Sequence, residues 1–179
     1  MGKCGCGTRE IVDWICTNIP NCKKITRTKG ASSTIADIKF IKAVQSGEII
    51  EATVEEDGST YGTYLHNLDS NHLHIYNYSA ESVECLKKCS DIQLVIVNVY
   101  SNDKIRLRRA IDMDWEKYES IEDFLAKLQK TDKKNYDLDT IDLFIRLKHH
   151  KINYKKIWNE IADYINKNHI LTNLDNFIK

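Results

Sequence analysis

The side chains best suited to chemistry lie in residues 66–78. Three imidazoles and one carboxylate fall within nine positions, at His66, Asp69, His72 and His74. Imidazole is the natural general base near neutral pH, and a carboxylate can orient it or join it in holding a divalent metal ion. Such a group suits cleavage of a phosphodiester, so these four residues are the predicted catalytic set of a nuclease or phosphodiesterase.

The same segment also predicts a binding surface. Side chains two positions apart share one face of a strand, so a strand over residues 71–78 would bring two imidazoles and two phenols together. Such a face offers stacking surfaces and hydrogen-bond donors to a base, a nucleotide-like metabolite or a protein. Two arginines of a neighbouring predicted strand would complete the surface if they lie on the same side. The predicted binding residues are His72, His74, Tyr76, Tyr78, Arg106 and Arg108.

Binding is favoured over catalysis by the spacing of these groups. Histidines two apart on a strand lie about 6.5–7 Å from each other, which suits contact with a ligand better than joint coordination of one ion. The sequence holds no H-E-x-x-H pair, no G-x-x-x-x-G-K-[ST] loop and no nucleophile elbow. We therefore predict a non-catalytic binding protein of the inhibitor or accessory type, whose partner is a protein or a small nucleotide-like ligand.

The N-terminal cysteines allow two further interpretations. The candidate metal ligands are Cys4, Cys6, Cys16 and Cys22. Structural zinc sites favour paired cysteines two to four residues apart, and these spacings differ, so plain thiols are favoured and no cofactor is predicted. Gly2 with Cys4 and Cys6 also resembles the acylated ends of peripheral membrane proteins, although the myristoylation pattern has Ser or Thr at position 6.

Composition narrows the class of partner. The 179 residues are 42% hydrophobic and carry no net charge, which allows a real core and gives no overall attraction to nucleic acid. Residues 31–100 hold ten acidic and four basic side chains, so long nucleic acid is a less favoured partner. No apolar run is long enough for a signal peptide or a membrane span, and the predicted location is the cytoplasm.

The predicted fold class is α+β. Helical periodicity covers residues 8–18 and 34–47, and period-two alternation begins near residue 48. An antiparallel sheet of about five strands is expected over residues 48–111, interrupted by one short helix. The apolar run Ile92–Tyr100 is the expected central strand. Residues 104–109 are the expected next strand of a hairpin, joined to it through Ser101, Asn102 and Asp103.

A C-terminal group of three helices is expected to cover this sheet. The first spans residues 120–128, and the other two form a hairpin between residues 138 and 165. Residues 1–130 are accordingly predicted to form the α+β core domain, and residues 131–179 a helical hairpin packed on it.

A short resemblance in the last helix gives a third prediction. The segment Ile157-Trp158-Asn159-Glu160-Ile161-Ala162 is similar to the Trp-x-x-Ile-Ala segment of Myb/SANT-type helical modules. The resemblance covers about ten residues, and the other tryptophans of that pattern are missing, since Trp14 and Trp115 lie far away. It implies a three-helix core and a nucleic-acid-binding module in the C-terminal helices. The alternative is that Trp158 simply packs in the core of the domain.

Overall fold

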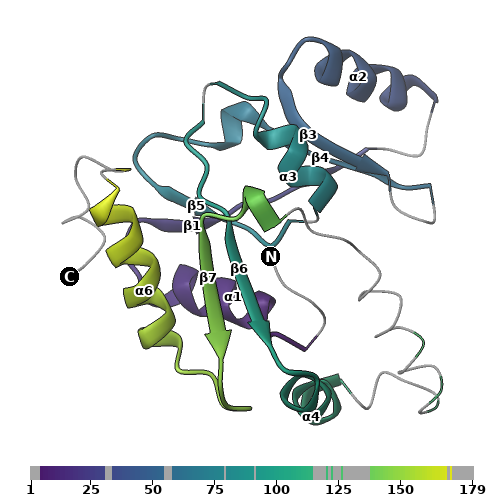
Figure 1. The fold of residues 1–179 in the computed structure, drawn as a ribbon. Coiled ribbons are helices and arrows are strands. Elements are labelled where there is room, and N and C mark those ends of the chain that lie inside the picture. Colours follow the sequence, from purple (N-terminus) through teal and green to yellow (C-terminus); the bar gives the residue numbers. More distant parts are fainter. Residues whose placement is uncertain are drawn as a thin grey trace.

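The computed structural model describes residues 5–30, 34–54, 58–78, 80–90, 92–114 and 138–168, together with Ser120, Glu122, Ala126 and Ile170. Within these residues the fold is mixed α/β, with two parallel strand pairs, one antiparallel three-stranded sheet and five α-helices (Figure 1). None of the described helices is both long and apolar enough to cross a membrane.

The first helix, α1 (Thr8–Asn18), has the expected bounds. It buries Ile11, Val12 and Ile15 and ends just before Pro20, which cannot continue a helix. The N-capping position is held by Gly7, with a left-handed φ of 71°. The preceding residue Cys6 is only 1% exposed, so the glycine-rich segment is packed from Gly5 onward.

The main core is built around the parallel strands β6 (Val97–Ser101) and β7 (Leu143–Leu147), in which Val99 pairs with Ile145. Helix α6 (Tyr154–Lys167) packs against β7 and α1. A second parallel pair, β1 (Cys22–Lys24) with β5 (Leu73–Ile75), adds to this core. Its buried residues are Cys6, Ile11, Ile15, Cys22, Val99, Ile145, Leu147, Ile157, Trp158, Ala162 and Ile165.

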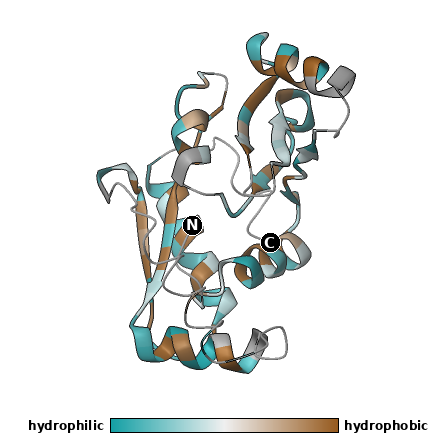
Figure 2. Ribbon diagram, turned by 90° about the vertical axis from the view of Figure 1, so that its right-hand side faces the viewer, coloured by the Kyte–Doolittle hydropathy of each residue, from teal (hydrophilic) through white to brown (hydrophobic). Residues whose placement is uncertain are grey.

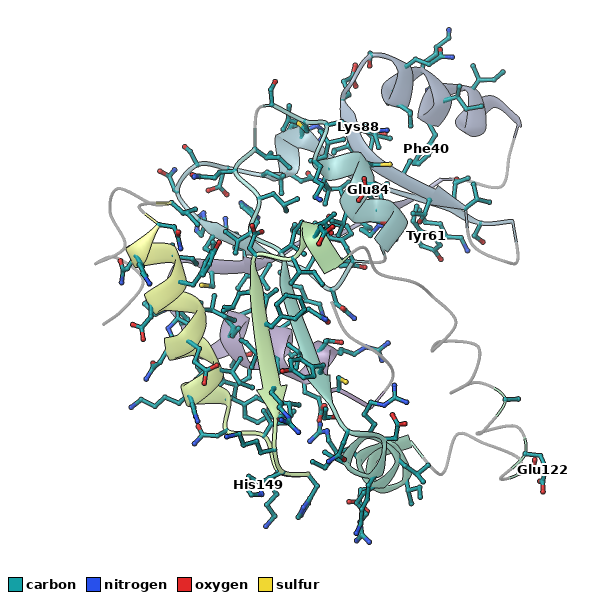
Figure 3. All side chains as sticks on the ribbon, in the orientation of Figure 1. Phe40, Tyr61, Glu84, Lys88, Glu122 and His149 are labelled. Atoms are coloured by element: carbon teal, nitrogen blue, oxygen red, sulfur yellow. The ribbon has the colours of Figure 1, made fainter. Side chains whose placement is uncertain are left out.

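A smaller unit is formed by the antiparallel sheet of β2 (Thr28–Lys29), β4 (Thr60–Tyr64) and β3 (Ile49–Val54), in that order. One face carries α2 (Thr34–Gln45), whose Phe40 and Ala43 pack on Ile49. A Cβ at Gly62 would come within 3.0 Å of both the Phe40 ring and Ile49, so glycine lets the ring approach the strand. Figure 3 shows Phe40 beneath α2, and Tyr61 on the far side of the strands.

Three shorter elements and one further helix complete the described fold. The 3-10 turns η1 (Leu65–Asn67) and η3 (Leu138–Thr140) precede β5 and β7. Helix α3 (Ala80–Leu86) packs against β3. Helix α4 (Asp103–Asp114) follows β6 directly and lies at its lower end in Figure 1.

The predicted α+β fold class is wrong. The strands do not form a single antiparallel sheet over residues 48–111, because β1 and β5 run parallel, as do β6 and β7. The strands in each pair are separated by about 40 residues or more of chain, whereas a hairpin connection spans only a few. Local periodicity indicates some of the strands and leaves their partners undetermined.

The predicted strand at residues 104–109 is also wrong, because this segment is the start of α4. Asn102 caps the helix by accepting a hydrogen bond from the Ile105 backbone nitrogen at 2.9 Å. Asp103 adds a negative charge to the first turn, where the helix dipole favours it. Ser101, Asn102 and Asp103, which were predicted to form a hairpin turn, therefore lead into the N-terminus of α4.

The predicted C-terminal group of three helices is not what the described residues form. Residues 143–147 form β7, in place of the first helix of the predicted hairpin. The expected helix at 120–128 lies outside the described residues apart from Ser120, Glu122 and Ala126. The predicted domain boundary at 130/131 also lies outside them, and that division remains a prediction.

The exposed side of α2 carries apolar side chains, although the helical periodicity of residues 34–47 favours burial of an apolar stripe. Ile38, Ile41 and Val44 are 48%, 53% and 39% exposed. Figure 2 shows hydrophobic and hydrophilic stretches alternating along this helix. Helical spacing alone does not identify the buried side when apolar residues lie on more than one side of the helix.

The strand assignment of β7 can be tested with two neighbouring substitutions. Ile145 is 2% exposed and Phe144 is 47% exposed, because successive strand residues face opposite sides. We expect Ile145→Ala to lower the free energy of unfolding by about 2–4 kcal/mol, and Phe144→Ala by less than about 1 kcal/mol. Urea unfolding measures both. Equal losses would contradict the strand, because a helical stripe would bury both side chains.

Candidate functional site

The polar face of the antiparallel sheet holds a buried carboxylate, Glu51. A β-bulge between Ile49 and Glu51 inserts one extra residue into β3. Ile49 therefore pairs with Tyr64 and faces α2, whereas Glu51 pairs with Thr63 and faces the opposite side. Residues two apart would share a face without the bulge. The Glu51 side chain has no exposed surface.

Arg27, just before β2, is the main partner of this carboxylate. Its Nη2 donates to Glu51 Oε1 at 2.6 Å and its Nε donates to Oε2 at 3.1 Å. Nη2 also lies 2.6 Å from Thr53 Oγ1 and 3.1 Å from the Tyr61 carbonyl oxygen. The Arg27 side chain is 12% exposed, so the pair forms a largely buried, bidentate ion pair.

Two hydroxyl groups complete the surroundings of Glu51. Ser82 of α3 donates to Oε1 at 2.6 Å, and Thr63 of β4 donates to Oε2 at 3.2 Å. Thr63 also lies 2.8 Å from the Tyr78 hydroxyl. Burial raises the pKa of Tyr78 to about 12, while the hydrogen bond with Thr63 acts in the opposite direction. We call Arg27, Glu51, Thr53, Thr63, Tyr78 and Ser82 the Glu51 cluster.

An aromatic and cationic edge borders the cluster at Tyr61. The Arg27 guanidinium carbon and the Lys29 Nζ each lie 5.7 Å from the centre of the Tyr61 ring. Cations over a phenol face are stabilised by the ring quadrupole. The site thus combines an enclosed carboxylate, which accepts hydrogen bonds, with cations beside it.

The predicted catalytic residues are only partly brought together. Asp69 contacts His72 Nδ1, and its backbone nitrogen donates to His74 Nε2 at 3.0 Å. Lys23 donates to Asp69 at 3.0 Å. The hydrogen bond with His72, as the largest effect, and that with Lys23 hold the pKa of Asp69 below its usual range. His66 is exposed on η1, and its ring packs on Tyr64.

The predicted binding residues divide among three places. Tyr76 and Tyr78 lie together with ring centres 4.4 Å apart, and Tyr78 belongs to the Glu51 cluster. The two histidines belong to the group around Asp69. Arg106 and Arg108 lie on α4, where Arg106 is 4% exposed and Arg108 pairs with Asp112.

The candidate metal cysteines gain no support in the described part of the chain. There, no three His, Cys, Asp or Glu side chains lie close enough together to hold a metal ion. Cys4 is outside the described residues, and burial raises the pKa of Cys22 to about 12, with a further contribution from Cys16. Cys6 is buried, so it is not available for acylation in this conformation.

The loop before α1 packs against α4. Gly5 and Gly7 have φ of 79° and 71°. Arg109 donates to the Gly5 carbonyl oxygen at 3.2 Å, to Glu10 and to the His150 carbonyl oxygen. The sequence Gly2-x-x-x-x-Gly7 has the glycine spacing of a phosphate-binding loop, but Thr8 and Arg9 stand where that pattern has Lys and Ser or Thr.

Sequence patterns do not single out the Glu51 cluster. Glu51 and Thr53 alternate with apolar residues, which is typical of the solvent face of a hairpin. Here that face is covered by α3 and by the segment before β2, which are distant in sequence. The sequence does show that residues 23–30 are basic and that residues 31–100 are acidic. It does not show that Arg27 and Glu51 lie close together in space.

Trp158 does not form the helical module that its segment resembles. It is 4% exposed and packs in the main core, which includes β6, β7 and α1 as well as α6. The implied three-helix core is therefore wrong for the described residues.

Comparison with known proteins supports a fold and no family. No family model matches the chain, and no curated protein matches its sequence significantly. Among solved structures it is similar to guanylate kinase from Anaplasma phagocytophilum, with a TM-score of 0.56 and 13% identity. The match covers 96% of this chain and 85% of that one. At this identity the likeness shows a shared fold alone.

The environment of Tyr78 predicts a pH dependence of stability. Its pKa of about 12 in the folded protein exceeds the usual value near 10. The stabilisation that comes from the protonated phenol is therefore complete below pH 10 and is lost as the pH rises toward 12. We expect the urea-unfolding free energy of Tyr78→Phe to decline less steeply between pH 10 and 12 than that of the unaltered protein. Tyr100→Phe, at an exposed position, should match the unaltered protein. Equal slopes for all three would contradict this prediction.

Proposed function

We propose that this chain binds a guanylate-type nucleotide at the Glu51 cluster. The observation that carries the proposal is the fully enclosed Glu51 carboxylate, set among hydroxyl donors with cations beside it. The name of the structural neighbour, guanylate kinase, supports the ligand class, since the two chains share a fold over 96% of this one. Prediction of a small nucleotide-like ligand agrees with this proposal.

The chemistry of the base explains the choice of guanine. Its Watson–Crick edge presents an N1–H and an N2 amino group, two donors that a carboxylate can accept together. Adenine presents an acceptor at N1 and no amino group at C2, so it would leave the carboxylate poorly paired. The phosphate would lie toward Arg27 and Lys29, at the Tyr61 edge.

Phosphoryl transfer is not part of this proposal. Proteins that transfer phosphate with a P-loop use the lysine of G-x-x-x-x-G-K-[ST] to hold the β- and γ-phosphates. This chain has Thr8 directly after Gly7, and the neighbouring Arg109 is engaged with Gly5 and Glu10. These features support binding without transfer, as a non-catalytic protein.

Replacement of the buried carboxylate tests the site. Glu51→Gln keeps the shape of the side chain but turns one acceptor oxygen into a donor. We expect it to weaken binding of guanosine monophosphate by about 10- to 100-fold, because charge-assisted hydrogen bonds to the base are lost. Isothermal titration calorimetry measures this affinity, with adenosine monophosphate as the comparison ligand.

The matched control is Glu48→Gln, which changes an exposed glutamate just before the same strand. It should bind guanosine monophosphate as the unaltered protein does, and thermal melting should show both variants folded. Equal affinity of Glu51→Gln and the unaltered protein would place the ligand elsewhere. Formation of guanosine diphosphate from adenosine triphosphate and guanosine monophosphate would contradict binding without transfer.

A phosphodiesterase at Asp69 is the second candidate function. The contact of Asp69 with His72 Nδ1 favours it, because a carboxylate on Nδ1 orients the ring and leaves Nε2 as the general base. It predicts nucleotide phosphodiester hydrolysis that falls at least about 100-fold in His72→Gln. His149→Gln, at an exposed position after β7, should hydrolyse at the unaltered rate. Absence of hydrolysis by the unaltered protein would exclude this candidate.

A further inference from the structure

The Glu51 carboxylate is already saturated by groups of the chain itself. Its two oxygens offer four acceptor positions. Arg27 fills two of them through Nε and Nη2, at 3.1 and 2.6 Å, while Thr63 and Ser82 fill one each at 3.2 and 2.6 Å. Donors of a base therefore have no place on this carboxylate until some of these bonds open.

Arg27 is the donor whose departure disturbs the fold least. Thr63 and Ser82 are 0% and 1% exposed and are fixed on β4 and α3. Arg27 precedes β2 in a stretch without regular structure, and its side chain reaches the surface. Its two hydrogen bonds go to different oxygens of Glu51. Two neighbouring donors on the edge of a base would bond the carboxylate in the same way.

We propose that the Arg27–Glu51 ion pair is an autoinhibitory contact that makes recognition of the base depend on the ligand's phosphate. The proposal rests on the proposed function, and it concerns the regulation of the same site. When a base takes the two positions on Glu51, the guanidinium of Arg27 must leave its buried partner. A charge removed from such a pair destabilises the protein unless another counter-charge replaces it.

A nucleotide brings that counter-charge, and a nucleoside does not. Phosphate oxygens bind a guanidinium in the same two-pronged manner as a carboxylate. Arg27 already lies over the Tyr61 ring together with Lys29, so a short movement keeps it beside a second cation at which an anion would gather. The site is thereby closed to guanosine and opened by guanosine monophosphate.

Thr53 holds the contact in place together with the Tyr61 carbonyl oxygen, and it is the side-chain anchor of the two. Its Oγ1 accepts from Arg27 Nη2 at 2.6 Å, the same nitrogen that bonds Glu51 Oε1. Thr53→Val removes this anchor but leaves the ion pair itself intact. It therefore loosens Arg27 without leaving a buried carboxylate unpaired.

The test is the affinity of the purified full chain for guanosine and for guanosine monophosphate, measured by isothermal titration calorimetry. We expect the unaltered protein to bind the nucleotide at least about tenfold more tightly than the nucleoside. Arg27→Gln should tighten guanosine binding by about tenfold and weaken nucleotide binding, which brings the two affinities together. Thr53→Val should tighten guanosine binding by about threefold or more. The control Arg146→Gln, at an exposed position on β7, should change neither affinity.

The outcomes distinguish failure of the autoinhibitory contact from failure of the proposed nucleotide binding. If the unaltered protein binds neither ligand, the proposed function fails and this contact has no role. If the unaltered protein binds guanosine and guanosine monophosphate equally well, the nucleotide site stands and the autoinhibitory contact is refuted. The same conclusion follows if neither variant binds guanosine more tightly than the unaltered protein does. If circular dichroism shows Arg27→Gln unfolded, Thr53→Val decides, because it retains both charges.

Discussion

The enclosed charge of Glu51 is the constraint on which the arrangement of the antiparallel sheet depends. A carboxylate without exposed surface must have its acceptor positions filled, because an unpaired buried charge costs several kcal/mol. The donors come from the segment before β2, from β4 and from α3, which are separated by tens of residues in sequence. These segments are therefore held together by a shared polar partner as well as by apolar packing.

The β-bulge explains how the short strand β3 supplies an apolar residue to one face of the sheet and a buried carboxylate to the other. Ile49 packs under Phe40 on one face, and Glu51 meets Arg27 on the other, although residues two apart in a regular strand share a face. Gly62 contributes from β4, since a side chain there would displace the Phe40 ring. Packing of α2 on the apolar face thus stabilises the three-stranded sheet whose other face carries the Glu51 cluster.

Local rules predicted the elements that local interactions determine. The bounds of α1 follow from a stripe of apolar residues and from Pro20, and Trp158 packs in the core as an amphipathic helix suggests. The same rules misread Ile105 and Leu107 as a strand, because apolar residues two apart match the period of a strand and not that of a helix. The capping bond from Asn102 settles the choice, and it depends on geometry that composition does not contain.

The candidate site was harder to predict, because its distinguishing property is burial. His72 and Asp69 attract attention as chemical groups, yet the Asp69 side chain is 40% exposed, and contacts at that exposure are weakened by solvent. Glu51 is an ordinary glutamate in sequence and becomes exceptional only when α3 covers it. An enclosed carboxylate also discriminates more strongly than an exposed one, since a ligand that fails to satisfy it leaves a charge without solvent. Under the proposed function, specificity for a base is therefore expected at Glu51 rather than at the histidines around Asp69.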